Sequence, residues 1–141
     1  MQATNIRVQD CPDLAILSDT HRIVRSIENL LSTRYPNLSI ITTSENQNQY
    51  DTILSHYNNN ENDPRFDRDI KQLRRTKKVH FTIDTNAIKL STIKSYKGLE
   101  AKNVVVIVEE NCDPATLYTG LTRAKNNLII INLGNQIFDS F

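Results

Sequence analysis

A chain of 141 residues is the size of one domain, long enough for a single hydrophobic core. Its 17 lysines and arginines against 16 aspartates and glutamates leave a net charge of +1, so any basic surface has to be local. No run approaches the ~18 apolar residues of a membrane span, and the first residues lack the pattern of a signal peptide, which predicts a soluble, cytoplasmic protein without membrane contacts.

The first half of the chain alternates between strand and helix patterns. Residues 13–18 (DLAILS) are a short apolar run, and residues 20–36 repeat apolar side chains at helical spacing until Pro36 ends the pattern. Residues 38–43 form a second β-branched run. A strand, a helix and a strand in this order favour a parallel sheet, and therefore the α/β class.

The middle of the chain is polar. Residues 44–63 are rich in asparagine and predict a surface loop with a short helix in it. A second helix is predicted over 63–78, with Asp63 as N-cap and Pro64 at its first position. This helix has one apolar face and one basic face, the latter made of Arg68, Lys71, Arg75 and Lys78. The basic face is either a solvated surface or a contact for nucleic acid.

The second half predicts strands over 79–83, 88–93, 103–110 and 127–133, with a helix from 114 to about 127. The runs at 103–110 and 127–133 lack polar alternation, which is typical of central parallel strands buried on both faces. No repeat or linker divides the chain. We therefore expect one domain over 1–141, in which 1–12 and 134–141 are peripheral and 44–63 is a surface loop.

The metal-binding residue types show no useful spacing. Cys11 and Cys112 are far apart, and the three histidines form no HExxH-like pair. The sequence therefore predicts neither a metal site nor a disulfide framework.

The stretch LYTGLTRAKNNLIIIN (117–132) places a glycine and an arginine in the predicted helix, away from its apolar stripe. An interior glycine costs a helix ~1 kcal/mol relative to alanine, so a close approach by a ligand or another backbone is expected at Gly120. Gly120 would then leave room beside the Arg123 guanidinium. The alternative is a tolerated glycine with an exposed arginine.

The stretch STIKSYKGLEAKNVVVIV (91–108) contains a glycine turn and an acid between two strands. Ligands bind open parallel sheets at the carboxyl ends of the strands, and we expect this turn to lie there. Gly98 would let the backbone approach a phosphate, and Glu100 would accept a hydrogen bond from a sugar hydroxyl. A plain turn with a solvated Lys/Glu pair is the alternative.

Together, these two stretches resemble motifs V and VI of the UvrD/Rep-like superfamily 1 helicases, whose patterns run approximately TIHxxKGLEFxxVxL and YVALTRAKxxLxI. Residues 13–31 look like the motif IV region of the same family, so the resemblance covers 13–31 and 88–132. It implies the second of two RecA-like lobes, which is a three-layer α/β domain with a mostly parallel sheet flanked by helices. In the family, ATP binds between the lobes and single-stranded nucleic acid runs across both.

The resemblance also implies roles for individual residues. Arg123 would be the catalytic arginine finger, which stabilises charge on the γ-phosphate; Glu100 would accept from the ribose and Gly98 would lie near the phosphates. Thr92 and Lys94 would contact the nucleic acid, although Lys94 stands where the family usually has histidine. Gly120 occupies a position that is usually alanine.

Two features depart from the family pattern. Where members often read LxRT, with an arginine that makes a second γ-phosphate contact, this chain has Asp19. Arg22 or Arg25 would have to reach the phosphate instead, or ATP hydrolysis would be weak. The large subdomain that members often insert between motifs IV and V is reduced to the polar loop and the basic helix.

The chain has three glycines and no GxxxxGK[ST] loop, so alone it should not hydrolyse ATP. The sequence predicts a lobe of an ATP-dependent DNA helicase or translocase that works with ATP and Mg²⁺, both bound mainly by the missing first lobe. Its partners would be single-stranded DNA, or RNA, and the N-terminal RecA-like lobe of the same protein. The alternatives are a degenerate, non-catalytic lobe that binds nucleic acid or protein, and an unrelated α/β nucleotide-binding domain.

Overall fold

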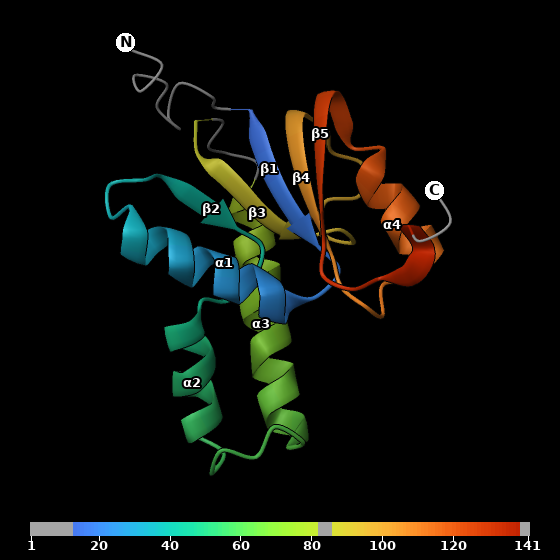
Figure 1. Ribbon diagram of the computed structural model, residues 1–141. Helices are drawn as coiled ribbons and strands as arrows, with labels where there is room; N and C mark the ends of the chain where they lie inside the picture. The colour runs from blue at the N-terminus through green and yellow to red at the C-terminus, as the bar shows by residue number, and fades with distance from the viewer. Residues whose placement is uncertain (1–12, 82–85, 139–141) are drawn as a thin grey trace.

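The computed structural model describes residues 13–81 and 86–138, and Figure 1 shows a twisted sheet with helices on both faces. The strands lie in the order β2-β3-β1-β4-β5, and each described strand pairs with its neighbours in parallel. Their bounds are β1 Leu14–Ser18, β2 Ile40–Thr42, β3 Ile88–Thr92, β4 Ala101–Val108 and β5 Ala124–Asn132. The predicted fold class, an α/β domain with a mostly parallel sheet between helices, is confirmed.

The two faces of the sheet are covered by different segments. Helix α1 (His21–Arg34) covers one face, where Val24 packs against Ile88 and Leu90. Helix α4 (Pro114–Leu121) and residues 93–100 cover the other face, where Leu117 and Ile93 join the main core. The chain therefore leaves β1 toward one face and β4 toward the other.

Helices α2 (Gln47–Ser55) and α3 (Pro64–Phe81) form an arm that projects beyond the carboxyl edge of the sheet (Figure 1). Asn46 is the N-cap of α2 and forms a capping box with Gln49. The Asn46 side-chain oxygen accepts a hydrogen bond from the Gln49 N–H, and the Gln49 side-chain oxygen accepts one from the Asn46 N–H. Asn58 and Asn59 adopt left-handed φ angles of 54° and 57° in the turn after α2. Asparagine tolerates this region well, which explains the asparagine-rich loop. The short helix predicted within 44–63 is confirmed.

A buried ion cluster fastens the arm to the rest of the domain. The Glu45 carboxylate is fully buried and accepts hydrogen bonds from Arg25 Nη1 at 2.7 Å and from Arg74 Nε at 2.6 Å. These two arginines belong to α1 and α3, and Arg25 also lies over the Tyr50 ring at 4.0 Å. Burial by itself would raise the pKa of Glu45, but the hydrogen bonds from Arg74 and Arg25 outweigh it and lower that pKa.

The predicted strand over 79–83 is wrong where the structure describes it, at residues 79–81. Residues 79–81 are the last residues of α3, and 82–85 lie outside the described residues. Steps of about four residues from Phe66 through Ile70 lead to Phe81, so continued helix keeps Phe81 in the core while Val79 is 70% exposed. The β-branched run VHFTI therefore gave a misleading strand signal. The helix start at Pro64 is as predicted.

The helix predicted from 114 to 127 is shorter than expected. Helix α4 ends at Leu121, so Arg123 lies in the connection and Leu128 in β5. The strand that follows is also not central: β5 is an edge strand, paired only with β4 in the described part of the chain. By contrast β4, between β1 and β5, is largely buried, as predicted.

Gly120 allows close packing of a helix, which differs from the role predicted for it. It is buried, and a Cβ built on it would lie 3.0 Å from Cδ1 and 3.2 Å from Cγ1 of Ile93. The glycine therefore lets α4 pack closely on residues 93–100, rather than making room beside the Arg123 guanidinium.

Replacing Gly120 with alanine tests this packing. Overpacking costs 1–3 kcal/mol and outweighs the ~1 kcal/mol that alanine gains in a helix, so we expect the free energy of unfolding to fall by about 1 kcal/mol. In an Ile93→Val background, which removes the Cδ1 methyl, the same change should cost nothing or stabilise. Urea unfolding of the four proteins measures this coupling, and equal costs in both backgrounds would rule the contact out.

His21 predicts a pH dependence of stability. Its Nδ1 lies 2.7 Å from Ser44 Oγ, and burial, aided by Arg74, lowers its pKa from 6.5 to about 4. Below pH 6.5 the unfolded chain takes up a proton that the folded chain refuses, so stability falls as pH drops from 6.5 toward 4, by about 2 kcal/mol. Chemical unfolding between pH 7 and 5 should show this fall in stability, and the His21→Gln variant should show a smaller one. An unchanged slope in that variant would assign the effect to other groups.

Candidate nucleotide and nucleic-acid edges

The predicted site residues are placed by residues 93–100, which connect the carboxyl end of β3 to the amino end of β4 across one face of the sheet. Gly98 has a φ of +87°, a left-handed conformation that favours glycine, so the turn requires this residue. Glu100 immediately precedes β4. The expectation that the whole turn lies at the carboxyl edge is therefore wrong, because its Gly98–Glu100 end lies at the amino edge.

Arg123 is held against the same turn. Its Nε donates to the Thr119 carbonyl at 3.0 Å and its Nη1 to the Leu99 carbonyl at 3.4 Å, while the Ala101 N–H donates to the Arg123 carbonyl at 3.1 Å. A further bond runs from Nη2 to Thr122, so three of the five guanidinium N–H donors are used. The structure thus brings Arg123 beside the Gly98–Glu100 turn, and the remaining donors stay available.

The Glu100 side chain is exposed, and its backbone is held by a hydrogen bond from Tyr96. The Glu100 carboxylate has one ion-pair neighbour in the described chain, Lys125, at a long 3.9 Å with both side chains 55% exposed. Beneath it the Tyr96 hydroxyl donates to the Glu100 backbone carbonyl at 3.1 Å. Burial raises the pKa of Tyr96 to about 12, which keeps the hydroxyl a donor. Glu100 is therefore a free acceptor at a fixed backbone position.

Thr92 and Lys94 lie at the opposite edge. Thr92 ends β3 and is buried, and its hydroxyl oxygen accepts from the Ser95 N–H at 3.2 Å. Lys94 is exposed and, with Lys97, borders a hollow of about 180 Å³ against α4. Neither lysine forms an ion pair with any described residue. The two ammonium groups are free to meet an anion.

The register of the strands gives the distance between the carboxyl edge of the sheet, with Thr92, and the amino edge, with Ala101. Thr92 pairs with Ser18, which pairs with Ile107, whereas Ala101 pairs with Ala124. The six residue steps from 101 to 107 span roughly 20 Å of strand. The predicted site residues therefore lie at two opposite edges of the sheet. We call the amino edge with Gly98, Glu100 and Arg123 the nucleotide edge, after its predicted ligand. We call the carboxyl edge with Thr92 and Lys94 the strand edge, after the nucleic-acid strand predicted to bind there.

The expectation that Arg22 or Arg25 replaces the arginine missing at Asp19 is wrong. All three follow β1 at the carboxyl edge, so they lie a sheet's length from Arg123. Arg25 is committed to Glu45. Arg22 Nη2 donates to Glu109 at 3.0 Å. They cannot share one phosphate with Arg123.

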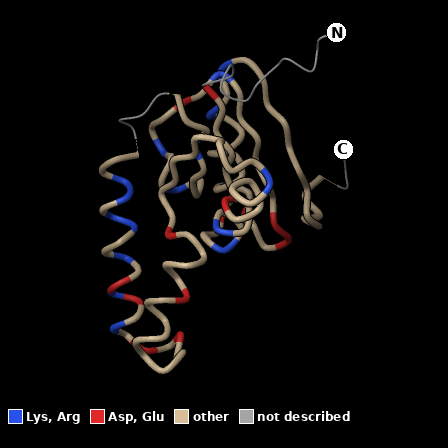
Figure 2. The backbone as a smooth tube through the Cα atoms, turned by 90° about the vertical axis from the view of Figure 1, so that its left-hand side faces the viewer, with Lys and Arg blue, Asp and Glu red and all other residues tan. Residues whose placement is uncertain are grey.

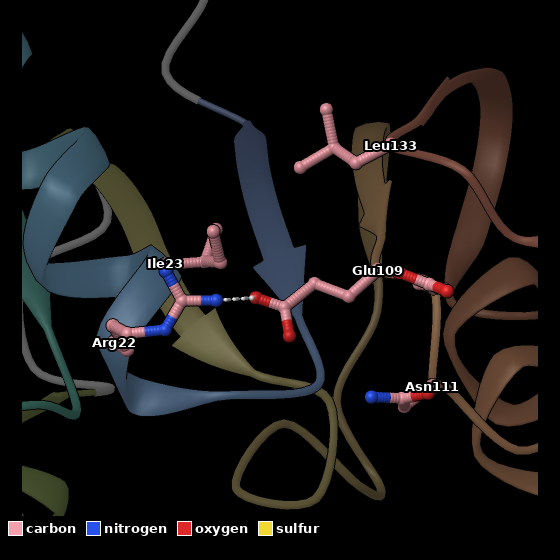
Figure 3. Close-up of a pocket in the computed structure, with 6 residues that line it drawn as sticks. Arg22, Ile23, Glu109, Asn111 and Leu133 are labelled. Carbon is pink, nitrogen blue, oxygen red and sulfur yellow. Dashed lines mark hydrogen bonds and ion pairs between the residues drawn. The ribbon is translucent and has the colours of Figure 1, made fainter.

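A crevice of about 310 Å³ opens where β1 and β4 send their chains to opposite faces (Figure 3). Arg22 reaches across it to Glu109, whose carboxylate also accepts from the Thr20 hydroxyl at 3.0 Å. Burial and the Glu109 charge raise the pKa of neighbouring Asp19. This cluster was not predicted from the sequence, because 87 residues separate Arg22 from Glu109 and their one shared signal is that each follows the end of a strand.

Lysine and arginine positions recur along helix α3 of the arm (Figure 2). Lys71 pairs with Asp67 at 2.9 Å and Arg68 with Asp69 at 3.5 Å. Arg75 and Lys78, nearer the sheet, form no ion pair within the described ranges. The available positive charge of α3 is therefore at its sheet-proximal end.

In residues 13–81 and 86–138, no group of three or more acidic, histidine or cysteine side chains could hold a metal ion. None of the described helices is long and apolar enough to cross a membrane.

Part of the second half of the chain is similar to a known protein family. Residues 88–131 match the family model of the UvrD-like helicase C-terminal domain. No curated protein sequence matches the chain. A similar solved structure is that of the C-terminal part of the Fun30 ATPase domain, with 15% identity and a TM-score of 0.49 over 94% of this chain. This chain spans 39% of that structure. The resemblance predicted from the two motif segments is confirmed over residues 88–131, which match the UvrD-like helicase C-terminal domain.

Proposed function

We propose that the domain is the second lobe of an ATP-dependent DNA helicase or translocase, with nucleotide at one edge of its sheet and the nucleic-acid strand at the other. The observation that supports this most is the docking of Arg123 on the Leu99 carbonyl, beside Glu100 and away from Thr92 and Lys94. One lobe can thus touch both ligands and couple a change at one edge to the other.

At the nucleotide edge, Arg123 acts as the arginine finger. A planar and permanently charged guanidinium stabilises the charge that develops on the γ-phosphoryl oxygens. Glu100 accepts a hydrogen bond from the ribose, and Gly98 allows the backbone to approach the phosphates. The first lobe holds ATP and Mg²⁺, which supplies additional positive charge at the phosphates when bound.

At the strand edge, Lys94 binds a backbone phosphate and Thr92 fixes the turn from which Lys94 projects. Lys97 borders the same hollow and adds a second cation. The partner is single-stranded DNA, with RNA the other nucleic acid to test. Because these contacts are to phosphates, they favour neither base sequence nor base type.

Substitution of Lys94 by alanine tests the strand edge. In the full-length protein we expect weaker binding of single-stranded oligonucleotides and a salt slope reduced by about 0.7, the value for one lost phosphate contact. Fluorescence anisotropy at several salt concentrations, with DNA and RNA, gives both quantities. Lys125→Ala removes an exposed lysine at the nucleotide edge and should leave the slope unchanged. An equal effect of both variants would show that Lys94 makes no specific contact.

The same titration decides the role of the arm. Joint replacement of Arg75 and Lys78 by alanine should reduce the salt slope further if α3 continues the strand track. An unchanged slope would assign the basic face to solvent.

A non-catalytic lobe that binds nucleic acid or protein is the second candidate. Asp19 favours it, since an aspartate stands where the family often has an arginine that contacts the γ-phosphate. ATP turnover by the full-length protein separates the two, because only the helicase lobe requires it.

A further inference from the structure

Strand β5 carries the largest group of exposed apolar side chains in the described part of the chain. Four apolar residues of β5 and Leu133, which directly follows the strand, are between 39% and 59% exposed. The four in the strand are Leu128, Ile129, Ile130 and Ile131. Scattered exposed apolar residues are normal, but a contiguous group of this kind marks an interaction surface.

The exposure affects both faces of the strand. The register with β4 places Leu128 and Ile130 beside Val104 and Val106, on the α4 side. Ile129 and Ile131 lie beside Val105 and Ile107, on the other side. Helix α1 packs on β1, β2 and β3, so it leaves this second side of β5 uncovered. A partner that covers β5 must therefore be apolar on both of its own faces.

The edge itself lacks the usual protection against pairing. Natural edge strands are short or carry charges or prolines, which prevents pairing with another strand. The other edge, β2, is three residues long, whereas β5 has nine. From Asn126 to Phe138 the sequence contains no charged residue and no proline. The outer backbone groups of β5 are thus available to a strand of the same kind.

We infer that β5 pairs antiparallel with β5 of a second copy of this chain, so that two sheets join across a two-fold axis. An uncharged strand segment with apolar residues on both faces is what residues 126–132 of β5 require, and the same segment of a second copy meets that requirement. A pairing centred on Ile130 sets Ile129 opposite Ile131 of the second copy and gathers four isoleucines on one face. Because both copies use the same edge and β2 is short, the contact closes at a dimer.

The size of the patch sets the strength of this contact. The exposed apolar area of β5 is on the order of 400 Å² per copy, against roughly 800 Å² per partner in a standard interface. The dimer is therefore weak and reversible, and it forms as the concentration rises.

Sedimentation velocity of the 141-residue chain, from low to several hundred micromolar, tests the inference. The expected result is a monomer that converts to a dimer with concentration. Ile129→Lys and, separately, Ile131→Lys should remain monomeric throughout, since each places a charge at the centre of the contact. The matched control is Val79→Lys on α3, which alters a side chain that is 70% exposed and should dimerise like the parent chain. Circular dichroism of each variant verifies that it is folded.

Hydrogen exchange provides a second readout, in which the amides of β5 should exchange more slowly at high concentration. A parent chain that stays monomeric, or dimers that persist in both β5 variants, would overturn the inference. Open-ended oligomers instead of a dimer would also overturn it. A dimer that forms only after residues 1–11 are deleted would identify this chain's own N-terminal segment as the occupant of the edge.

Discussion

Replacement of Arg123 by alanine in the full-length protein is expected to reduce the turnover number for ATP by about 10³-fold or more. The affinity for ATP should change only a few-fold, because an arginine finger acts mainly on charge that develops in the transition state. Steady-state ATPase kinetics and equilibrium binding of a fluorescent ATP analogue measure the two effects separately.

Two controls distinguish a catalytic role from a structural one. Arg123→Lys keeps the charge but loses the planar fork, so it should recover only a small part of the activity. Arg22→Ala removes an arginine at the far edge of the sheet and should leave turnover nearly intact. Turnover at the parent level in Arg123→Ala would exclude Arg123 from the reaction, and an equal loss in Arg22→Ala would show that the assay reports on folding.

Replacement of Glu45 by alanine is expected to lower the free energy of unfolding by about 3 kcal/mol or more. The change leaves Arg25, whose side chain is 10% exposed, without its carboxylate, and Arg74 loses the same partner. Uncompensated buried charge is among the most destabilising defects of a domain. Urea unfolding monitored by circular dichroism gives this quantity.

The matched control is Asp67→Ala, which breaks an ion pair on the same arm. Lys71 and Asp67 are about 60% exposed, so this variant should lose less than ~0.5 kcal/mol. The lowered pKa of Glu45 adds a pH signature: its contribution is complete above pH 4.5 and is lost as the pH falls through the lowered pKa. Similar losses in the two variants would mean that burial of the Glu45 cluster is of no consequence.

Local sequence patterns predicted those parts of the fold that depend on neighbouring residues. Short-range periodicity and capping predicted the β1-α1-β2 unit and the starts of α3 at Pro64 and of α4 at Pro114. The errors arose where one signal fits two structures. Residues 79–81 read as the start of a strand but continue α3. LIIIN reads as a central strand but lies at an edge, because an apolar run does not reveal which neighbours cover it.

The sequence indicated which residues belong to the candidate site, but it did not indicate how they lie relative to one another. The KGLE and LTRAK segments indicated Gly98, Glu100 and Arg123, and the structure brings these three together. Their separation from Lys94 depends on the direction in which residues 93–100 cross the sheet, which no spacing records. Glu45 and the Arg22–Glu109 pair were missed for a related reason: their partners are distant in sequence and meet only in the folded chain.

ATPase activity of the full-length gene product that contains this segment, measured with and without single-stranded DNA beside the 141-residue chain, tests the helicase-lobe assignment most directly. We predict turnover in the longer chain alone, stimulated by DNA and abolished by Arg123→Ala. A full-length protein that binds DNA but hydrolyses no ATP would contradict the assignment and establish a non-catalytic binding module in its place.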